Sequence, residues 1–117
     1  MRGLALIAAV GGALLTTAGL AQSQEQRYGF SAIAKDDLAG AEARLLAQRA
    51  AEPNEPSVLL NLAYVYARTG RTDQAMALYR QVLAGENVLM LTGGRQHVWS
   101  RDLAQRGLDR ARTMASR

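Results

Sequence analysis

The sequence predicts an all-α fold with about two antiparallel helix hairpins, a short C-terminal β-hairpin and a capping helix. Three observations lead to this prediction. The chain of 117 residues is 49% hydrophobic but only 5% aromatic, and its many Ala and Leu residues favour helices over strands. Residues of similar size recur at a spacing of 34 positions, and this recurrence stops after Ala84. We therefore expect one small repeat domain with a different closing segment.

Residues 1–21 are interpreted as a signal peptide. Arg2 provides a positive start, positions 3–20 carry no charge, and small residues precede the expected cleavage after Ala21. An uncleaved anchor is the alternative, because eighteen uncharged residues reach the lower limit for a membrane span. Gly and Thr residues dilute this run and no basic flank follows it, so we expect removal. The mature protein would then be periplasmic or secreted.

The 34-residue recurrence divides the next part of the chain into two units, residues 22–55 and 56–87. The aligned pairs, which keep their size class or polarity, are Tyr28 with Leu62, Gly29 with Ala63, Ala32 with Tyr66, Ala41 with Ala75, and Leu45 with Tyr79. Residues three and four apart share a helix face, so each unit is expected to contain two helices.

Capping and breaking residues give the expected helix ends in the first unit. Asp36 and Asp37 can begin a helix that continues to about Ala51, before Pro53. Pro56 is tolerated in the first turn of the following helix.

A tight turn is expected in the second unit. Gly70 can end one helix in a left-handed conformation, Thr72 is predicted to be the N-cap of the next, and Asp73 lies in its first turn.

This arrangement resembles the tetratricopeptide repeat family, whose pattern is W-x2-L-G-x2-Y, then A-x3-F, then a closing P. In the clearer unit the matching residues are Leu59, Leu62, Ala63, Tyr66, Ala75 and Tyr79, and Asn87 stands in place of the closing Pro. The first unit is a weaker copy. The resemblance implies that the first helix of each pair lines a concave groove that receives an extended peptide or a partner helix.

By this resemblance the expected partner-binding residues are Phe30, Ile33, Leu60, Asn61, Tyr64 and Arg68. Tyr and Arg are enriched at the energetic centres of interfaces. Tyr64 has an equally weighted alternative role, in which it only packs between the two units. The protein is therefore expected to be an interaction or scaffold module.

Residues 88–99 are predicted to form the hairpin. Val88–Thr92 and Arg95–Trp99 read as strands joined by a two-residue turn at Gly93 and Gly94. An isolated hairpin is only marginally stable, so at least one of its apolar side chains must lie against the helices. The candidates are Leu89, Leu91, Val98 and Trp99.

Residues 100–115 are predicted to form the capping helix, with Ser100 as its N-cap. Its inner face would hold Leu103, Ala104, Leu108, Ala111 and Met114, and its outer face Arg101, Arg106, Arg110, Arg112 and Arg117. A charged outer face is typical of a solvated terminal cap. Docking on an acidic partner or an anionic membrane remains the alternative.

Catalysis is not expected. The chain has no Cys and one His, His97, and nothing in the sequence suggests a metal site, a cofactor or nucleic-acid binding. The net charge of +4 is a mild excess.

Two rival functions stay open. One is a structural subunit or self-associating component of a cell-envelope assembly, because repeat stacks usually need about three units for stability. Such a subunit would be a homo-oligomer or be tethered by an uncleaved leader. The other is a small envelope enzyme that uses His97.

Overall fold

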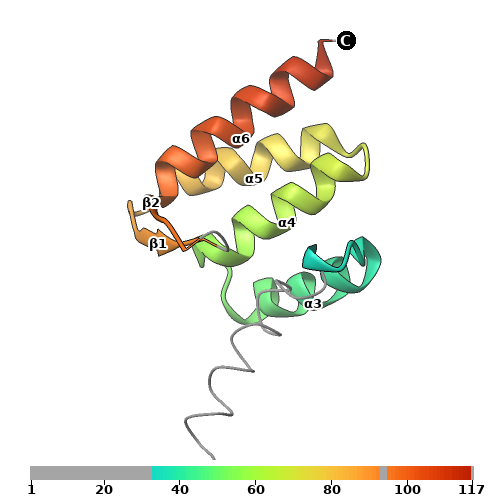
Figure 1. The fold of residues 1–117 in the computed structure, drawn as a ribbon, viewed down its shortest axis with the longest axis horizontal. Helices are drawn as coiled ribbons and strands as arrows, with labels where there is room; N and C mark the ends of the chain where they lie inside the picture. Colours follow the sequence, from blue (N-terminus) through green and yellow to red (C-terminus); the bar gives the residue numbers. More distant parts are fainter. Residues whose placement is uncertain (1–32, 93–94, 117) are drawn as a thin grey trace, which may run out of the picture.

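The computed structural model describes residues 33–92 and 95–116, which are mostly helical with one small two-stranded sheet. The elements are α3 (Leu38–Ala51), α4 (Pro56–Arg68), α5 (Thr72–Ala84), β1 (Leu89–Leu91), β2 (His97–Trp99) and α6 (Ser100–Ala115), as Figure 1 shows. The expected signal peptide and residues 22–32 of the first expected unit lie outside the described residues. No helix in the described ranges is long and apolar enough to span a membrane.

Local chemistry accounts for the start of α3 and of α4. The Asp37 carboxylate is the N-cap of α3 and accepts a hydrogen bond of 3.0 Å from the Gly40 N–H. Pro56 is the first residue of α4, where its missing N–H removes no helical hydrogen bond. Both features match the sequence prediction.

Gly70 ends α4 in the left-handed conformation that was predicted, with φ of 79°. The Arg71 N–H reaches back to the Tyr66 carbonyl at 2.8 Å, which closes the turn in the manner of a Schellman motif. The prediction that Thr72 is the N-cap of α5 is wrong, because the N-cap is Arg71 and Thr72 is already helical. Arg71 closes one helix and opens the next, so the turn is one residue shorter than expected.

A second left-handed residue lies at the matching place before α3. Asp36 has φ of 61°, and positions 36 and 70 are 34 residues apart. The starts of α3 and α5, Leu38 and Thr72, have the same separation. Backbone conformation and helix starts therefore recur at the spacing found in the sequence.

The helices α4, α5 and α6 run antiparallel in succession, with α5 between the other two, and α3 packs on α4 (Figure 1). Ala41, Ala63 and Ala75 are fully buried, as expected for small residues where helices approach closely. Larger buried side chains fill the core around them, chiefly Leu45, Val58, Leu59, Leu62, Val65, Leu78 and Leu108.

The first and last turns of α6 differ from the prediction. Trp99, not Ser100, is the N-cap, and Ser100 is fully buried as the first helical residue. Its hydroxyl accepts a hydrogen bond from the Val88 N–H at 2.9 Å, so it fastens the base of the hairpin instead of capping the helix. Met114 was expected on the inner face but is 43% exposed, near the C-terminal end of α6, where this helix diverges from α5 (Figure 1).

The hairpin is present, but its register differs by one residue from the prediction. Leu89 pairs with Trp99 and Leu91 with His97, and the Thr92 N–H bonds to the Gln96 carbonyl at 2.9 Å. Three residues, 93–95, therefore separate the paired positions instead of two. Arg95 takes a left-handed conformation with φ of 60°, which suits the last position of a three-residue hairpin loop.

This register selects which side chains meet the helices. Met90 and Val98 are half-buried and Met90 packs on the core. Of the four residues proposed for this role, only Val98 faces inward, whereas Leu89, Leu91 and Trp99 are exposed. The prediction required at least one of these candidates to lie against the helices, and Val98 meets it. The other three lie on the outward face because side chains alternate along each strand.

Candidate interaction surface

The expected partner-binding residues differ in their accessibility. Leu60 is only 9% exposed and belongs to the core, and Ile33 is half-buried against that core. Asn61 and Tyr64 are half-buried on α4, and Arg68 at its end is exposed. Phe30 lies outside the described residues. The surface that a partner could touch among these residues is therefore centred on Tyr64 and Arg68.

Tyr64 and Arg68 form a preorganised pair on one face of α4, since they are four residues apart. Arg68 Nη1 donates a hydrogen bond to the Tyr64 hydroxyl at 2.6 Å, and the guanidinium lies 5.6 Å from the centre of the Tyr64 ring. Such stacking holds a long side chain in one geometry, so a partner would meet an Arg that has already lost part of its freedom.

Arg68 also contacts Asp36, in the turn before α3. Its Nη2 lies 3.2 Å from the Asp36 Oδ1, and the two side chains are 47% and 72% exposed. The hydrogen bond to Tyr64 is the main cause, and the Asp36 charge a lesser one, that raises the pKa of Arg68 above its ordinary value. An ion pair this exposed contributes little to stability and can exchange with another carboxylate.

The hydroxyl of a second tyrosine lies behind this surface. Tyr79 on α5 is 7% exposed, and burial raises its pKa, with an opposing effect from the charge of Arg110 on α6 and a small reinforcing effect from Tyr64. Besides packing on α5, α4 and α6 also contact each other.

A second cluster, which was not predicted from the sequence, joins α3 to the turn between α4 and α5. The Arg71 guanidinium lies 4.6 Å from the centre of the Tyr66 ring. It also makes a bidentate ion pair with the Glu42 carboxylate, in which Nη1 lies 3.1 Å from Oε2 and Nη2 contacts Oε1. The hydrogen bond from Arg71 lowers the pKa of Glu42. Glu42 and Arg71 are 29 residues apart, and no local pattern in the sequence links them.

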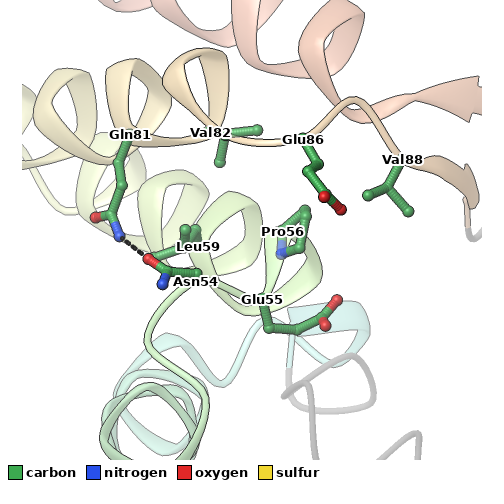
Figure 2. Close-up of a pocket in the computed structure, with 9 residues that line it drawn as sticks. Asn54, Glu55, Pro56, Leu59, Gln81, Val82, Glu86 and Val88 are labelled. Atoms are coloured by element: carbon green, nitrogen blue, oxygen red, sulfur yellow. Dashed lines mark hydrogen bonds between the residues drawn. The ribbon is translucent and has the colours of Figure 1, made fainter.

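A pocket of about 310 Å³ lies between the start of α4 and the end of α5 (Figure 2), and Tyr64 is not among the residues that line it. Gln81 Nε2 closes one side by donating to the Pro53 carbonyl at 3.1 Å and to Asn54 Oδ1 at 3.3 Å. The carboxylates of Glu55 and Glu86 line the same pocket. The Gln81 contacts fasten the loop between α3 and α4 to α5, so the polar groups on that side serve the packing of the helices.

His97 is exposed on β2 and its strand neighbour across the hairpin is Leu91. Within the described ranges, no group of three or more His, Asp or Glu side chains lies close enough to hold a metal ion. Comparisons with protein-family models, curated proteins and solved structures gave no match for this chain.

Proposed function

We propose that this protein is an exported helical-repeat module that binds a peptide or helix of another protein on the face of α4 that carries Tyr64 and Arg68. The 34-residue recurrence of left-handed residues and helix starts supports the tetratricopeptide-like arrangement behind this proposal. The observation that carries the binding role is the geometry of Arg68, which is exposed yet held by Tyr64.

The partner is proposed to present a carboxylate beside an apolar or aromatic group. The carboxylate would replace Asp36 on Arg68, and the apolar group would cover the Tyr64 ring. The Arg68–Asp36 ion pair is exposed and weak, so its loss costs little, and the Coulomb attraction between Arg68 and the carboxylate of the partner would be stronger where water is excluded.

Two single substitutions at this surface are expected to have opposite effects. Arg68→Ala should weaken binding about 30-fold, as expected for a residue at the energetic centre of an interface. Asp36→Asn should strengthen binding a few-fold, because it removes the internal competitor for Arg68. Arg80→Ala, at an exposed position on α5, is the matched control and should leave affinity unchanged.

The partner is first identified by placing a photo-crosslinking phenylalanine derivative at position 64 in intact cells. The same group at Gln74, which is exposed on α5, controls for random contact. The expected result is one dominant adduct from position 64, and affinities for that partner are then measured with the purified variants. Two results would refute the proposal that a partner binds at Tyr64 and Arg68. One is the same set of adducts from positions 64 and 74, and the other is equal affinities for Arg68→Ala and Asp36→Asn.

Self-association is the rival function, and the same experiment detects it. An adduct of the protein with itself, together with a dimer or larger species in light scattering of the purified protein, would replace the proposed groove with a homo-oligomer. A cleaved leader is tested separately by the mass of the exported chain, which should begin at Gln22.

A further inference from the structure

The outward face of the hairpin is the largest concentration of exposed apolar side chains in the described part of the chain. Of the six large hydrophobic residues exposed there, four lie in residues 88–99: Val88, Leu89, Leu91 and Trp99. Leu89 and Trp99 are direct partners across the strands, and Leu91 lies opposite His97 on the same face. Their exposed fractions are 49%, 46% and 64% for Leu89, Trp99 and Leu91.

Positive charge is concentrated in the same part of the molecule. Residues 87–116 carry five Arg and two Asp, whereas residues 33–86 carry six basic and seven acidic side chains. No acidic residue occurs between Glu86 and Asp102. Arg95 is exposed at the hairpin loop, and Arg106 and Arg110 are exposed on α6.

Three of the five arginines in residues 87–116 are available to an external anion. Among the described residues, Arg95, Arg106 and Arg110 make no ion pair, and Arg112 has only an exposed contact of 3.7 Å with Asp109 on its own helix. Arg101 binds the Gly85 carbonyl through two nitrogens and so joins the start of α6 to the end of α5. The hydrogen bond from the Val88 N–H to the Ser100 hydroxyl joins the base of the hairpin to the start of α6, and the two elements lie next to each other (Figure 1).

We infer that the hairpin and α6 dock on an anionic lipid surface, with Leu89, Leu91 and Trp99 inserted at the boundary between headgroups and acyl chains. Trp favours this boundary because its ring is apolar and its N–H is polar. Arginines beside it would lie among the anionic headgroups, where each basic residue strengthens attachment. This surface is separate from the proposed partner groove on α4.

Charge and shape favour lipid over two other occupants. A second copy on a twofold axis would bring two surfaces with excess positive charge together, which is unfavourable. An acidic protein partner would need a pocket for its anchoring side chains. The pocket beside the hairpin reaches Val88 but is not lined by Leu89, Leu91 or Trp99. A lipid surface requires no such complementary pocket.

The chain contains a single Trp, Trp99, so its fluorescence reports this surface alone. The full chain is mixed with vesicles of phosphatidylcholine, with or without phosphatidylglycerol. We expect a blue shift of Trp99 emission, and quenching by lipids brominated on their acyl chains, only with phosphatidylglycerol. Attachment through an uncleaved leader alone would leave Trp99 unquenched and would contradict the inference.

Raising the ionic strength from about 0.1 M to about 1 M shortens the screening length from about 10 Å to about 3 Å and should reverse the binding. Leu89→Ser with Leu91→Ser should weaken vesicle affinity about tenfold or more through lost apolar contact. Arg95→Gln with Arg106→Gln should do the same through lost charge. Leu46→Ser, an exposed apolar position on α3, is the matched control and should retain wild-type affinity.

Three other results would overturn the inference. The first is equal quenching on vesicles with and without phosphatidylglycerol. The second is a Trp99 blue shift without vesicles that accompanies a dimer in sedimentation, which would indicate a second copy. The third is the same shift with an acidic polypeptide such as polyglutamate but none with vesicles, which would indicate an acidic protein partner.

Discussion

Replacement of Gly107 by Ala is expected to destabilise the protein, although Ala is the better helix former. Gly107 lies inside α6, where Ala normally stabilises a helix by about 0.8–1.0 kcal/mol relative to Gly. A methyl group at this position, however, would point directly at the Tyr79 ring of α5. The sign of the effect therefore depends on how closely α6 approaches α5.

The structure shows too little space for this methyl group. The Tyr79 Cζ and Cε2 atoms would lie within 2.9 Å of it. Carbon atoms prefer separations of about 3.5–4.0 Å, so the ring or the helix would have to move. Tyr79 is only 7% exposed, which leaves its ring little room. Overpacking of this kind costs about 1–3 kcal/mol.

Subtraction of the gain in helix propensity leaves a net loss of about 1 kcal/mol in the free energy of unfolding. For a domain of this size, such a loss lowers Tm by about 4–8 °C. Urea unfolding followed by circular dichroism measures the free energy. Ala77→Gly, at an exposed position in α5, measures the propensity term in this same protein and should cost about 1 kcal/mol.

A second background tests the cause. Tyr79→Leu removes the outer ring atoms, and in that background Gly107→Ala should stabilise by about 0.5–1 kcal/mol. Two results would refute the reasoning: Gly107→Ala stabilising the otherwise unchanged protein, or an equal loss in both backgrounds.

Three further predictions concern other positions. Ala75→Phe should cost about 1–3 kcal/mol or more because Ala75 is fully buried between helices, and a thermal melt identical to wild type would show that the helix pairing is wrong. Gly70→Ala should cost about 1 kcal/mol in urea unfolding through its positive φ alone, since no atom lies within 4 Å of the added Cβ, and an unchanged free energy would contradict a left-handed turn. Glu42→Gln should destabilise at neutral pH but not in strong acid. Arg71 lowers the pKa of Glu42 in the folded state, so the stabilisation is complete above the ordinary Glu pKa of about 4.3 and is lost as pH falls through the lowered value. Unfolding midpoints of wild type and Glu42→Gln that differ equally at all pH values would count against this ion pair.

Local sequence chemistry predicted most of the helix boundaries correctly. Pro56 at the first turn of α4 and Gly70 after its end act through their own backbone restrictions, so their effects can be read without knowledge of the fold. The N-cap predictions for Thr72 and Ser100 were wrong by one residue. Both places carry a hydrogen bond that the local pattern does not reveal. The Arg71 N–H donates to the Tyr66 carbonyl of α4, and the Ser100 hydroxyl accepts from the Val88 N–H.

The polar contacts of the candidate surface were less predictable than the helices. Tyr64 and Arg68 share a face of α4, so sequence spacing was enough to place them together. The Asp36 partner of Arg68 is 32 residues away and becomes its neighbour only after α3 and α4 have packed. The exposure of Leu89 and Leu91 likewise depended on a hairpin register that turn residues alone did not specify.

The succession of α4, α5 and α6 has a consequence for how quickly the chain can fold. Helices that follow one another in the sequence also touch one another, and three residues, 69–71, are enough to connect α4 to α5. In the described part of the chain no long segment has to be brought back on itself, so the entropy lost in closing loops before contacts form is small. Helical proteins with such local contacts fold in microseconds to milliseconds. Under the proposed export, rapid folding of this kind would let the chain reach its native state soon after it crosses the membrane.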